Sequence, residues 1–280
     1  MNLLGIDFED WYHPELVRRH LKSEKHEPKV INGLDKILEI LRRNDTYATF
    51  FVVGELLKDK PEILDKILSN GHEIGFHTMH HTKINLFSSM NVFADEIQIF
   101  DKMTKGKSRG FRAPTFSIDK NSSWAIDVLA SHGYVYDSSV VPVKTSMYGI
   151  SNAEKKPYKI SSKTLEKHNP DGKIIEFPIM VTEILGKKIP AGGGFYLRLL
   201  PLKMIKSAIR EYEKMQMPST FYIHSWELTP EFMPRINLPL KDRFVTYHNL
   251  NKAESRLSEI LKGFNFTSFE RYINSTEFTN

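Results

Sequence analysis

The sequence predicts an α/β fold in which βα units surround a parallel sheet or barrel. Short apolar segments alternate with amphipathic helices at a spacing of about 30 residues, which is typical of βα units. Polar residues of chemical interest come directly after the predicted strands, where such folds place their active sites. The length of 280 residues fits a single barrel, and no repeat or linker divides the chain. We therefore expect one domain over residues 1–280.

The first predicted strand is the apolar segment 3–8, which delivers the acids Asp7, Glu9 and Asp10 at its C-terminal end. Segment 31–43 follows with apolar residues at helical spacing. The later elements of this half are strand 47–53, helix 61–68, strand 73–77, helix 92–103, a strand end or turn at 110–114, helix 123–131 and the extended segment 134–137.

The second half begins with a polar, Lys-rich segment around 148–170, which we expect to be an excursion with long loops. Residues 250–280 are expected to form a C-terminal helix–strand extension. The predicted elements are strand 174–178, helix 201–215, strand 220–224, helix 253–261 and strand 264–269.

The composition excludes several kinds of chain and of site. Hydrophobic residues make up 40% and charged residues 26%, which is ordinary for a globular protein and excludes collagen-like and low-complexity chains. The 39 Lys and Arg exceed the 34 Asp and Glu by five charges without forming a basic block, so we expect no nucleic-acid partner. The absence of cysteine leaves histidine and carboxylates as the metal ligands.

The N-terminus reaches Asp7 before the apolar core of a signal peptide could form. No apolar run approaches the roughly 20 residues of a membrane span. We therefore expect a cytoplasmic protein without a membrane span; its oligomeric state is left open.

The sharpest local motif is the segment 77–81, which carries three histidines. His77 and His81 are four apart and would share one face of a helical turn, with His77 and His80 as the second choice. On its own such a pair also fits a solvated polar turn. Two imidazoles, one carboxylate from the first strand and open positions for water describe a catalytic metal site, in which Zn²⁺ lowers the pKa of its water to about 7.

Three later segments offer further chemical groups. Arg112 could orient a catalytic carboxylate, or be a surface arginine beside a turn proline. Asp137 lies in a segment that ends a strand and also fits turn chemistry. His224 follows an apolar strand and could protonate a leaving group, although a lone histidine there is more often a hydrogen-bonded core residue.

In this order the motifs resemble the polysaccharide deacetylase (NodB-homology) family of metal-dependent carbohydrate esterases. The similarity runs from Ile6 to about Trp226, and its most specific part is the segment 71–81, Gly-His-Glu-Ile-Gly-Phe-His-Thr-Met-His-His. Further motifs are similar to the subgroup of bacterial exopolysaccharide and surface-glycan biosynthesis, and this similarity continues through Arg243-Phe244. These motifs are segments 112–117, 136–139, 190–195 and 224–227.

The resemblance implies a distorted (β/α) barrel, usually of seven units, and the hydrolysis of N-acetyl or O-acetyl groups on sugars. It also implies one divalent metal ion, with Zn²⁺ as the first candidate and Co²⁺, Ni²⁺ or Fe²⁺ as alternatives. The implied site residues are Asp10, His77 and His81 as metal ligands, Glu9 as base, Arg112 to orient that base, the Thr115 N–H for the oxyanion and His224 as acid.

The first motif departs from the family pattern, in which two adjacent aspartates precede a glycine. Here the run is Asp7-Phe8-Glu9-Asp10-Trp11, and strand alternation puts Asp7 and Glu9 on one face and Asp10 on the other. Asp7 could therefore be the base, with Glu9 or Asp10 as ligand. We assign Asp10 to the metal and Glu9 to the base, with Asp7 as the second candidate for the base.

Glycines 192–194 lack the following Lys-Ser/Thr of a phosphate-binding loop, so we expect a tight loop that lines a sugar cleft. Phe195 or Tyr196 could then stack on a sugar ring. The candidate substrate-binding residues are Asp137, Gly193, Phe195 and Trp226.

The expected activity is removal of acetyl groups, N-acetyl first, from an amino sugar of a surface polysaccharide or its precursor. Two alternatives stay open: hydrolysis of a C–N bond in a cyclic amide, and glycan binding without turnover. The expected partner of the deacetylase activity is an acetylated sugar or glycan.

Overall fold

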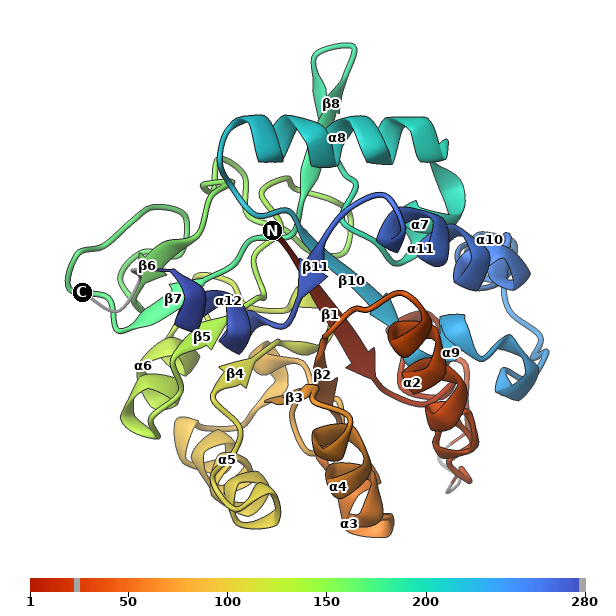
Figure 1. The fold of residues 1–280 in the computed structure, drawn as a ribbon. Helices are drawn as coiled ribbons and strands as arrows, with labels where there is room; N and C mark the ends of the chain where they lie inside the picture. The colour runs from red at the N-terminus through yellow and green to blue at the C-terminus, as the bar shows by residue number, and fades with distance from the viewer. Residues whose placement is uncertain (23–25, 277–280) are drawn as a thin grey trace.

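The computed structural model describes residues 1–22 and 26–276, and its core is a curled sheet of mainly parallel strands (Figure 1). The strands follow the order β10-β1-β2-β3-β4-β5-β7-β6, and every neighbouring pair as far as β7 is parallel. The parallel strands are β1 (Asn2–Phe8), β2 (Thr49–Val52), β3 (Glu73–Phe76), β4 (Gly110–Phe111), β5 (Tyr136–Asp137), β7 (Ile174–Glu176) and β10 (Thr220–His224).

The sheet curls so that the chain just after β7 approaches β10, the strand at the other end of the path. An isolated bridge joins Ile179, just after β7, to Thr220 of β10, and the Met180 N–H donates to the Thr220 carbonyl at 3.0 Å. β1 is buried along its whole length, which explains why its sequence is apolar without alternation. The predicted α/β fold is therefore confirmed, and the expected distorted barrel is a curled half-barrel whose path has seven parallel strands within the described residues.

Helices cover the outside of the sheet (Figure 1). In α2 the apolar residues Leu34, Ile37 and Leu41 are all buried, as their helical spacing predicts. No helix within residues 1–22 and 26–276 is long and apolar enough to cross a membrane. The helices are α1 (Glu15–Arg18), α2 (Leu34–Arg43), α3 (Gly54–Asp59), α4 (Glu62–Ser69), α5 (Met90–Thr104), α6 (Trp124–Ser131), α7 (Phe195–Leu199), α8 (Leu202–Lys214), α9 (Ser225–Leu228), α10 (Leu240–Tyr247), α11 (Ala253–Leu261) and α12 (Phe269–Ser275).

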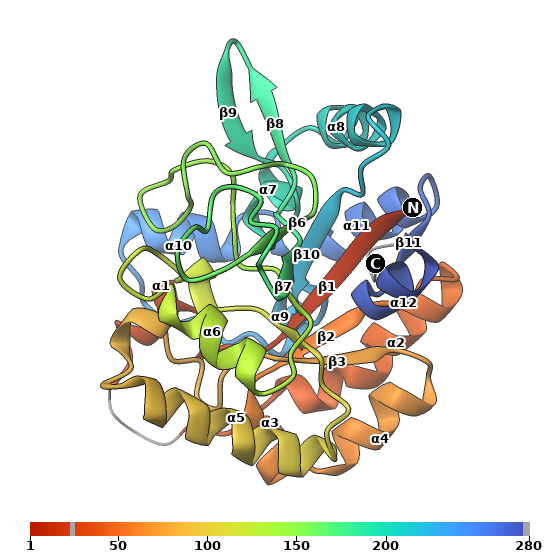
Figure 2. The ribbon, with the colours of Figure 1, turned by 90° about the vertical axis from the view of Figure 1, so that its left-hand side faces the viewer.

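Three parts of the fold differ from the sequence-based prediction. The polar segment 148–170 contributes β6 (Tyr158–Ile160), an antiparallel edge strand on β7. β8 (Val181–Ile184) and β9 (Lys187–Pro190) form a hairpin that projects from the body (Figure 2). The expected last strand, 264–269, is only β11 (Phe266–Thr267), after which Ser268 caps α12. Residues 277–280 of the expected extension lie outside the described residues.

An arginine crosses the interior of the curled sheet. The Arg112 side chain is fully buried, and its guanidinium lies 4.1 Å from the centre of the Phe51 ring. Gly5 of β1 makes room for it, because a Cβ at this position would lie 2.5 Å from Arg112 Nη1. The absence of a side chain at Gly5 thus lets a charged group reach the carboxyl ends of the strands from within.

Candidate active site

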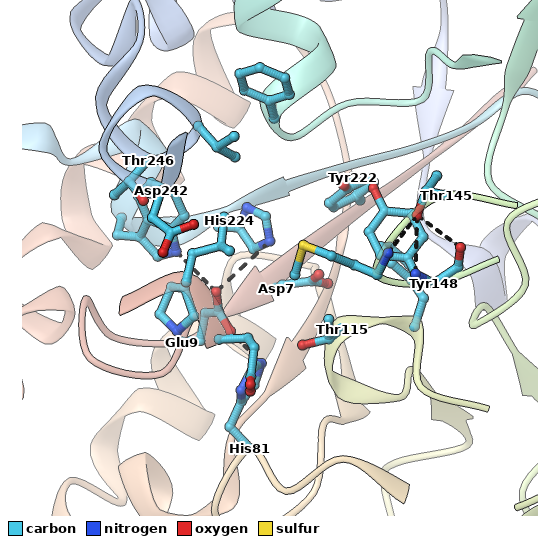
Figure 3. Close-up of a pocket in the computed structure, with 18 of the residues that line it drawn as sticks. Asp7, Glu9, His81, Thr115, Thr145, Tyr148, Tyr222, His224, Asp242 and Thr246 are labelled. Carbon is cyan, nitrogen blue, oxygen red and sulfur yellow. Dashed lines mark hydrogen bonds and ion pairs between the residues drawn. The ribbon is translucent and has the colours of Figure 1, made fainter. Parts of the chain in front are cut away.

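The carboxyl ends of the parallel strands open into one pocket of about 390 Å³ (Figure 3). Asp7 comes from β1 and His224 from the end of β10, and the two are partners in the sheet register. Glu9 follows β1, and His77 with His81 follows β3. Strand ends far apart in the sequence therefore supply a single set of charged groups.

Glu9, His77 and His81 form a buried group whose ligand atoms all lie within 4.8 Å of one another. The His77 Nδ1–H donates to the Arg112 carbonyl at 2.6 Å, which leaves Nε2 free to bind a metal. Burial lowers the pKa of His77 to about 4, so the imidazole is neutral near pH 7, as metal binding requires.

Segment 77–81 reaches this geometry as a loop and not as the predicted helical turn. Thr78 and His81 have φ angles of 58° and 52°, in the left-handed region. These two residues bend the chain so that the centres of the His77 and His81 rings lie 5.0 Å apart. His80 instead points away and lies 2.8 Å from Glu55, so it does not join the group.

The Glu9 carboxylate fits a metal ligand. Its Oε1 accepts a hydrogen bond of 2.9 Å from Trp226 Nε1, whereas Oε2 accepts none within the described part of the chain although His81 Nε2 lies 2.6 Å away. Burial alone would raise the pKa of Glu9, but the neighbouring histidines lower it below its usual range. A carboxylate oxygen and two imidazole nitrogens that converge in this way are a donor set for Zn²⁺ and similar cations.

The Asp10 carboxylate does not lie beside His77 and His81, so the structure does not give it the ligand role that we expected from the sequence. This carboxylate accepts hydrogen bonds from the backbone N–H groups of Trp11, Lys29 and Val30 at 2.6–2.8 Å. Alternation along β1 extends past its last residue, so Asp7 and Glu9 face the pocket and Asp10 faces the opposite way. Glu9 therefore occupies the place beside the histidines that we assigned to Asp10.

Asp7 occupies the place that we assigned to Glu9. Its Oδ1 accepts a hydrogen bond of 2.7 Å from Arg112 Nη1. The rest of the guanidinium is held by Ser138, whose carbonyl accepts from Nε at 3.0 Å and whose Oγ accepts from Nη2 at 2.8 Å. Arg112 thus orients a carboxylate, as expected, and that carboxylate is Asp7.

Thr115 lines the pocket on the side of Asp7 and has a φ angle of 54°. The segment before it is fixed because the Ala113 N–H donates to Ser139 Oγ at 2.8 Å. This placement suits a backbone donor beside the reacting group.

His224 faces the same pocket from the end of β10, and its Nε2 lies 3.8 Å from Glu9 Oε1. Its Nδ1 lies 2.6 Å from Glu227 Oε2, and Arg198 Nε donates to Glu227 Oε1 at 2.5 Å. Burial would lower the pKa of His224, but the carboxylates of Glu227 and Glu9 raise it to about 9. His224 is therefore protonated near pH 7, the form that a general acid requires.

The substrate-binding candidates divide into two groups. Phe195 and Trp226 line the pocket, together with Tyr148, Phe116 and Tyr196. Asp137 and Gly193 are not among the described residues that line it.

Asp137 is fully buried, and its backbone pairs with that of Glu176 on the neighbouring strand. Gly193 forms a bridge with Tyr222 at a φ angle of 115°, and a Cβ there would lie 1.7 Å from the Tyr222 carbonyl oxygen. Its role in the structure is close backbone packing against Tyr222.

Sequence reasoning missed two buried partners. Arg198 is a fully buried cation in a short, mostly apolar helix, and an isolated Arg in such a segment was the available signal. Glu176 ends the apolar strand β7 and pairs with Asp137, in the same position relative to its strand as the acids of β1.

Two family models match consecutive parts of the chain. Residues 31–136 match the sequence model of the polysaccharide deacetylase family, and residues 138–274 match a Domain of unknown function (DUF3473). The first match contains His77, His81 and Arg112, and the second contains His224.

The matches to curated proteins are local. Over 63 residues the chain is 35% identical to the peptidoglycan-N-acetylmuramic acid deacetylase PdaA of Bacillus subtilis, which covers 22% of each chain. Over 100 residues it is 30% identical to a chitooligosaccharide deacetylase of Bradyrhizobium sp., which covers 34% of this chain and 42% of the relative. The chain thus spans less than half the length of these relatives.

Two solved structures share the fold over nearly the whole chain. One is assigned as a polysaccharide deacetylase from Mycobacterium smegmatis, with a TM-score of 0.60, 14% identity and coverage of 98% of this chain and 90% of that one. The other is Puue allantoinase, with a TM-score of 0.57, 14% identity and coverage of 99% and 91%. At this identity the likeness shows the fold alone.

The fold and the site together form a curled α/β half-barrel, shared with the solved structure from Mycobacterium smegmatis, with a buried carboxylate and two histidines at its strand ends. Residues 31–136 are similar to the polysaccharide deacetylase family, and the curated relatives match only short parts of the chain. The narrower assignment to exopolysaccharide biosynthesis stays a prediction.

Proposed function

We propose that this protein is a metal-dependent deacetylase that removes N-acetyl groups from an amino sugar of a surface polysaccharide or its precursor. The observation that carries the proposal is the joint arrangement of three groups around one pocket. Glu9, His77 and His81 offer metal ligands, Asp7 with Arg112 offers an oriented base, and His224 with Glu227 offers an acid.

A divalent cation held by Glu9, His77 and His81 would polarise an acetyl carbonyl and lower the pKa of a water molecule. Asp7 would accept the proton from the attacking water, while Arg112 fixes the orientation of its carboxylate. The Thr115 N–H would donate to the oxyanion of the tetrahedral intermediate. His224 would then protonate the departing amine, with Glu227 holding the ring in place.

The pocket walls support a sugar substrate. Phe116, Tyr148, Phe195, Tyr196 and Trp226 give it aromatic faces, on which sugar rings commonly stack. The identities of curated relatives that act on peptidoglycan and chitooligosaccharide support the same class. A cytoplasmic location and a role in exopolysaccharide biosynthesis are further parts of the proposal.

The fold similarity to Puue allantoinase keeps a second activity in the test, namely hydrolysis of a cyclic amide. The two substrate classes differ in how much of the aromatic pocket wall they would contact. A small cyclic amide would leave most of the aromatic wall unused, whereas a glycan would contact it.

The deciding experiment measures metal content and acetate release from acetylated chitooligosaccharides and peptidoglycan fragments. Allantoin is assayed in parallel. The variants are His77→Ala, which removes a ligand, and His168→Ala, which removes an exposed histidine far from the pocket as a matched control. We expect one metal per wild-type chain with acetate release, both lost in His77→Ala and both kept in His168→Ala.

A metal-free wild-type protein that still releases acetate would overturn the metal-dependent mechanism. Turnover of allantoin alone would favour the cyclic-amide activity. Tight glycan binding with no product would favour a binding protein.

A further inference from the structure

Two acids that lie side by side outside the pocket lining are not used by the proposed reaction. Asp137 ends β5 and Glu176 ends β7, and the two residues are partners in the parallel register. Both side chains are fully buried, with 0% of either residue exposed. Adjacent carboxylates that are both buried and both ionised would repel each other strongly, so this pair requires an explanation.

Each acid has one oxygen with a donor and one without. Asp137 Oδ1 accepts from Ser139 Oγ at 2.5 Å, and Glu176 Oε1 accepts from the Val140 N–H at 2.9 Å. Asp137 Oδ2 and Glu176 Oε2 accept no hydrogen bond from any residue in 1–22 or 26–276. The two carboxyl groups are within hydrogen-bonding reach of each other, so a single proton between them would satisfy both free oxygens.

The surroundings favour a pair with one negative charge. The charge of Arg112 acts on Asp137, but the hydrogen bonds of Arg112 go to Asp7 and Ser138. The Tyr158 hydroxyl, on the neighbouring β6, donates its one hydrogen to the Leu165 carbonyl at 2.5 Å, so it does not donate to either acid. Burial raises the pKa of Asp137 to about 6, and burial with the nearby charge of Asp137 raises the pKa of Glu176 well above its usual range.

The pair is connected to the candidate active site through two serines. Ser139 Oγ, which donates to Asp137, accepts from the Ala113 N–H two residues before Thr115. Ser138 Oγ, in the next position, accepts from Arg112 Nη2 and donates to the Phe177 carbonyl at 2.9 Å. A displacement of the acid pair would therefore move both the Thr115 segment and the guanidinium that orients Asp7.

We propose that Asp137 and Glu176 share one proton and act as positioning residues, which hold Ser139 and through it the segment that carries Thr115. The shared proton lets two buried acids brace the end of the sheet with a single charge. The catalytic consequence of this bracing rests on the proposed deacetylase function, whereas the shared proton itself does not.

The shared proton is tested by infrared difference spectroscopy at neutral pH. A protonated carboxyl group gives a C=O stretching band that shifts in heavy water. We expect a band of the wild-type protein to be lost in Glu176→Gln, because an amide replaces the protonated acid and donates to Asp137 in its place. Glu211→Gln, on the exposed face of α8, is the matched control and should keep the band. A spectrum in which Glu176→Gln loses no such band would overturn the shared proton.

The positioning role is tested with Ser139→Ala, Glu176→Gln and Glu176→Ala. We expect Ser139→Ala to lower kcat by about 10- to 100-fold with little change in KM or metal content, because the Thr115 segment loses its anchor. Glu176→Gln should keep kcat within about twofold of wild type, since the amide preserves both the charge of the pair and its hydrogen bonds. Glu176→Ala should lower kcat, so that Gln rescues what Ala loses.

Amide hydrogen exchange of the peptide around 111–117 gives a readout that needs no activity. It should become faster in Ser139→Ala and stay unchanged in Glu176→Gln. Unchanged exchange together with unchanged kcat in Ser139→Ala would overturn the positioning role. If the wild-type protein releases no acetate, the proposed deacetylase fails, and the infrared band and the exchange rates still decide whether the pair shares a proton and holds the segment.

Discussion

Three acids within four positions of the chain have three different surroundings. Glu9 faces imidazoles, Asp7 faces the Arg112 guanidinium, and Asp10 accepts from backbone N–H groups at the start of the short helix Val30–Gly33. The chemistry available to each carboxylate therefore follows from its neighbours and not from its own type. The first two are suited to a ligand and a base, and the third to a structural cap.

Asp7→Asn should lower kcat/KM by about 10²- to 10⁴-fold while the protein still binds its metal, because the amide cannot take up the proton of the attacking water. Acetate release and metal content, measured on the same preparation, check this. Loss of the metal in Asp7→Asn would contradict the separation of base and ligands.

Asp10→Ala is the matched control on the same segment. It should lower the free energy of unfolding by about 1 kcal/mol, as loss of a helix cap does, and leave metal content and kcat unchanged. Denaturant unfolding measures the first effect. If Asp10→Ala instead lost the metal, the ligand assignment made from the sequence would be restored.

At this scale the sequence predicted the kinds of residue better than their roles. His77, His81, Arg112 and His224 all face one pocket or support it, as their positions after apolar strands indicated. The order of acids after β1 was assigned by a family motif that this chain does not keep. The period of two along the strand favoured Asp7 and Glu9 on one face, and the structure agrees with the period.

At the scale of elements, the end of the sheet opposite the pocket is closed by α12. Glu73, the first residue of β3, accepts hydrogen bonds from Thr49, from the Tyr136 hydroxyl at 2.5 Å and from the Glu270 N–H at 3.0 Å. The last of these lies in the first turn of α12. One buried acid thus ties three strands, β2, β3 and β5, to the C-terminal helix.

The stability of the protein should fall as the pH rises through the titration of Glu73. Burial raises the pKa of Glu73 from 4.5 to about 7 in the folded protein, so between these values the folded state keeps a proton that the unfolded state has released. The folded state therefore loses stability, on the order of 3 kcal/mol, as the pH rises from about 4.5 to about 7.

Glu73→Gln cannot titrate and isolates this effect. Its free energy of unfolding relative to wild type should increase over the same pH range and level off above it. Denaturant unfolding across that range measures the difference. A difference that does not change with pH would show that Glu73 keeps an ordinary pKa.

Elements with long apolar runs were predictable along their whole length, whereas short or exposed ones were located only roughly or missed. β1 and β10 are buried strands, and their apolar sequences indicated them. β4 and β5 are two residues long and lie inside the predicted strand end or turn 110–114 and the extended segment 134–137, whose bounds gave little periodic signal. The apolar residues of 264–269 read as a strand, but the cap at Ser268 starts a helix that buries Phe269 and Ile273. The hairpin β8–β9 is largely exposed, so its sequence has no pattern of buried apolar residues that would predict it.

At the scale of the whole molecule, the metal group couples the site to the stability of the fold. Glu9 and the two histidines come from different strand ends and meet only when β1, β2 and β3 have paired. A metal that binds the folded form alone should stabilise it by about 2.7 kcal/mol at a free concentration 100 times the Kd.

Thermal unfolding with and without chelator checks this coupling. We expect Zn²⁺ to raise the Tm of wild type and of His168→Ala, and to leave the Tm of His77→Ala unchanged. An equal rise in His77→Ala would place the bound metal elsewhere.

The position of β1 between β2 and β10 also concerns how the chain is made. Leu3 pairs with Thr220, 217 positions later in the chain (220 − 3). At a translation rate of about 5–20 residues per second, one edge of this buried strand stays without its partner for roughly 10–40 s. During that time the nascent chain exposes an apolar strand edge, the feature that chaperones recognise and that drives aggregation. His224 belongs to the same late strand, so the ribosome must pass it before all the groups around the pocket exist.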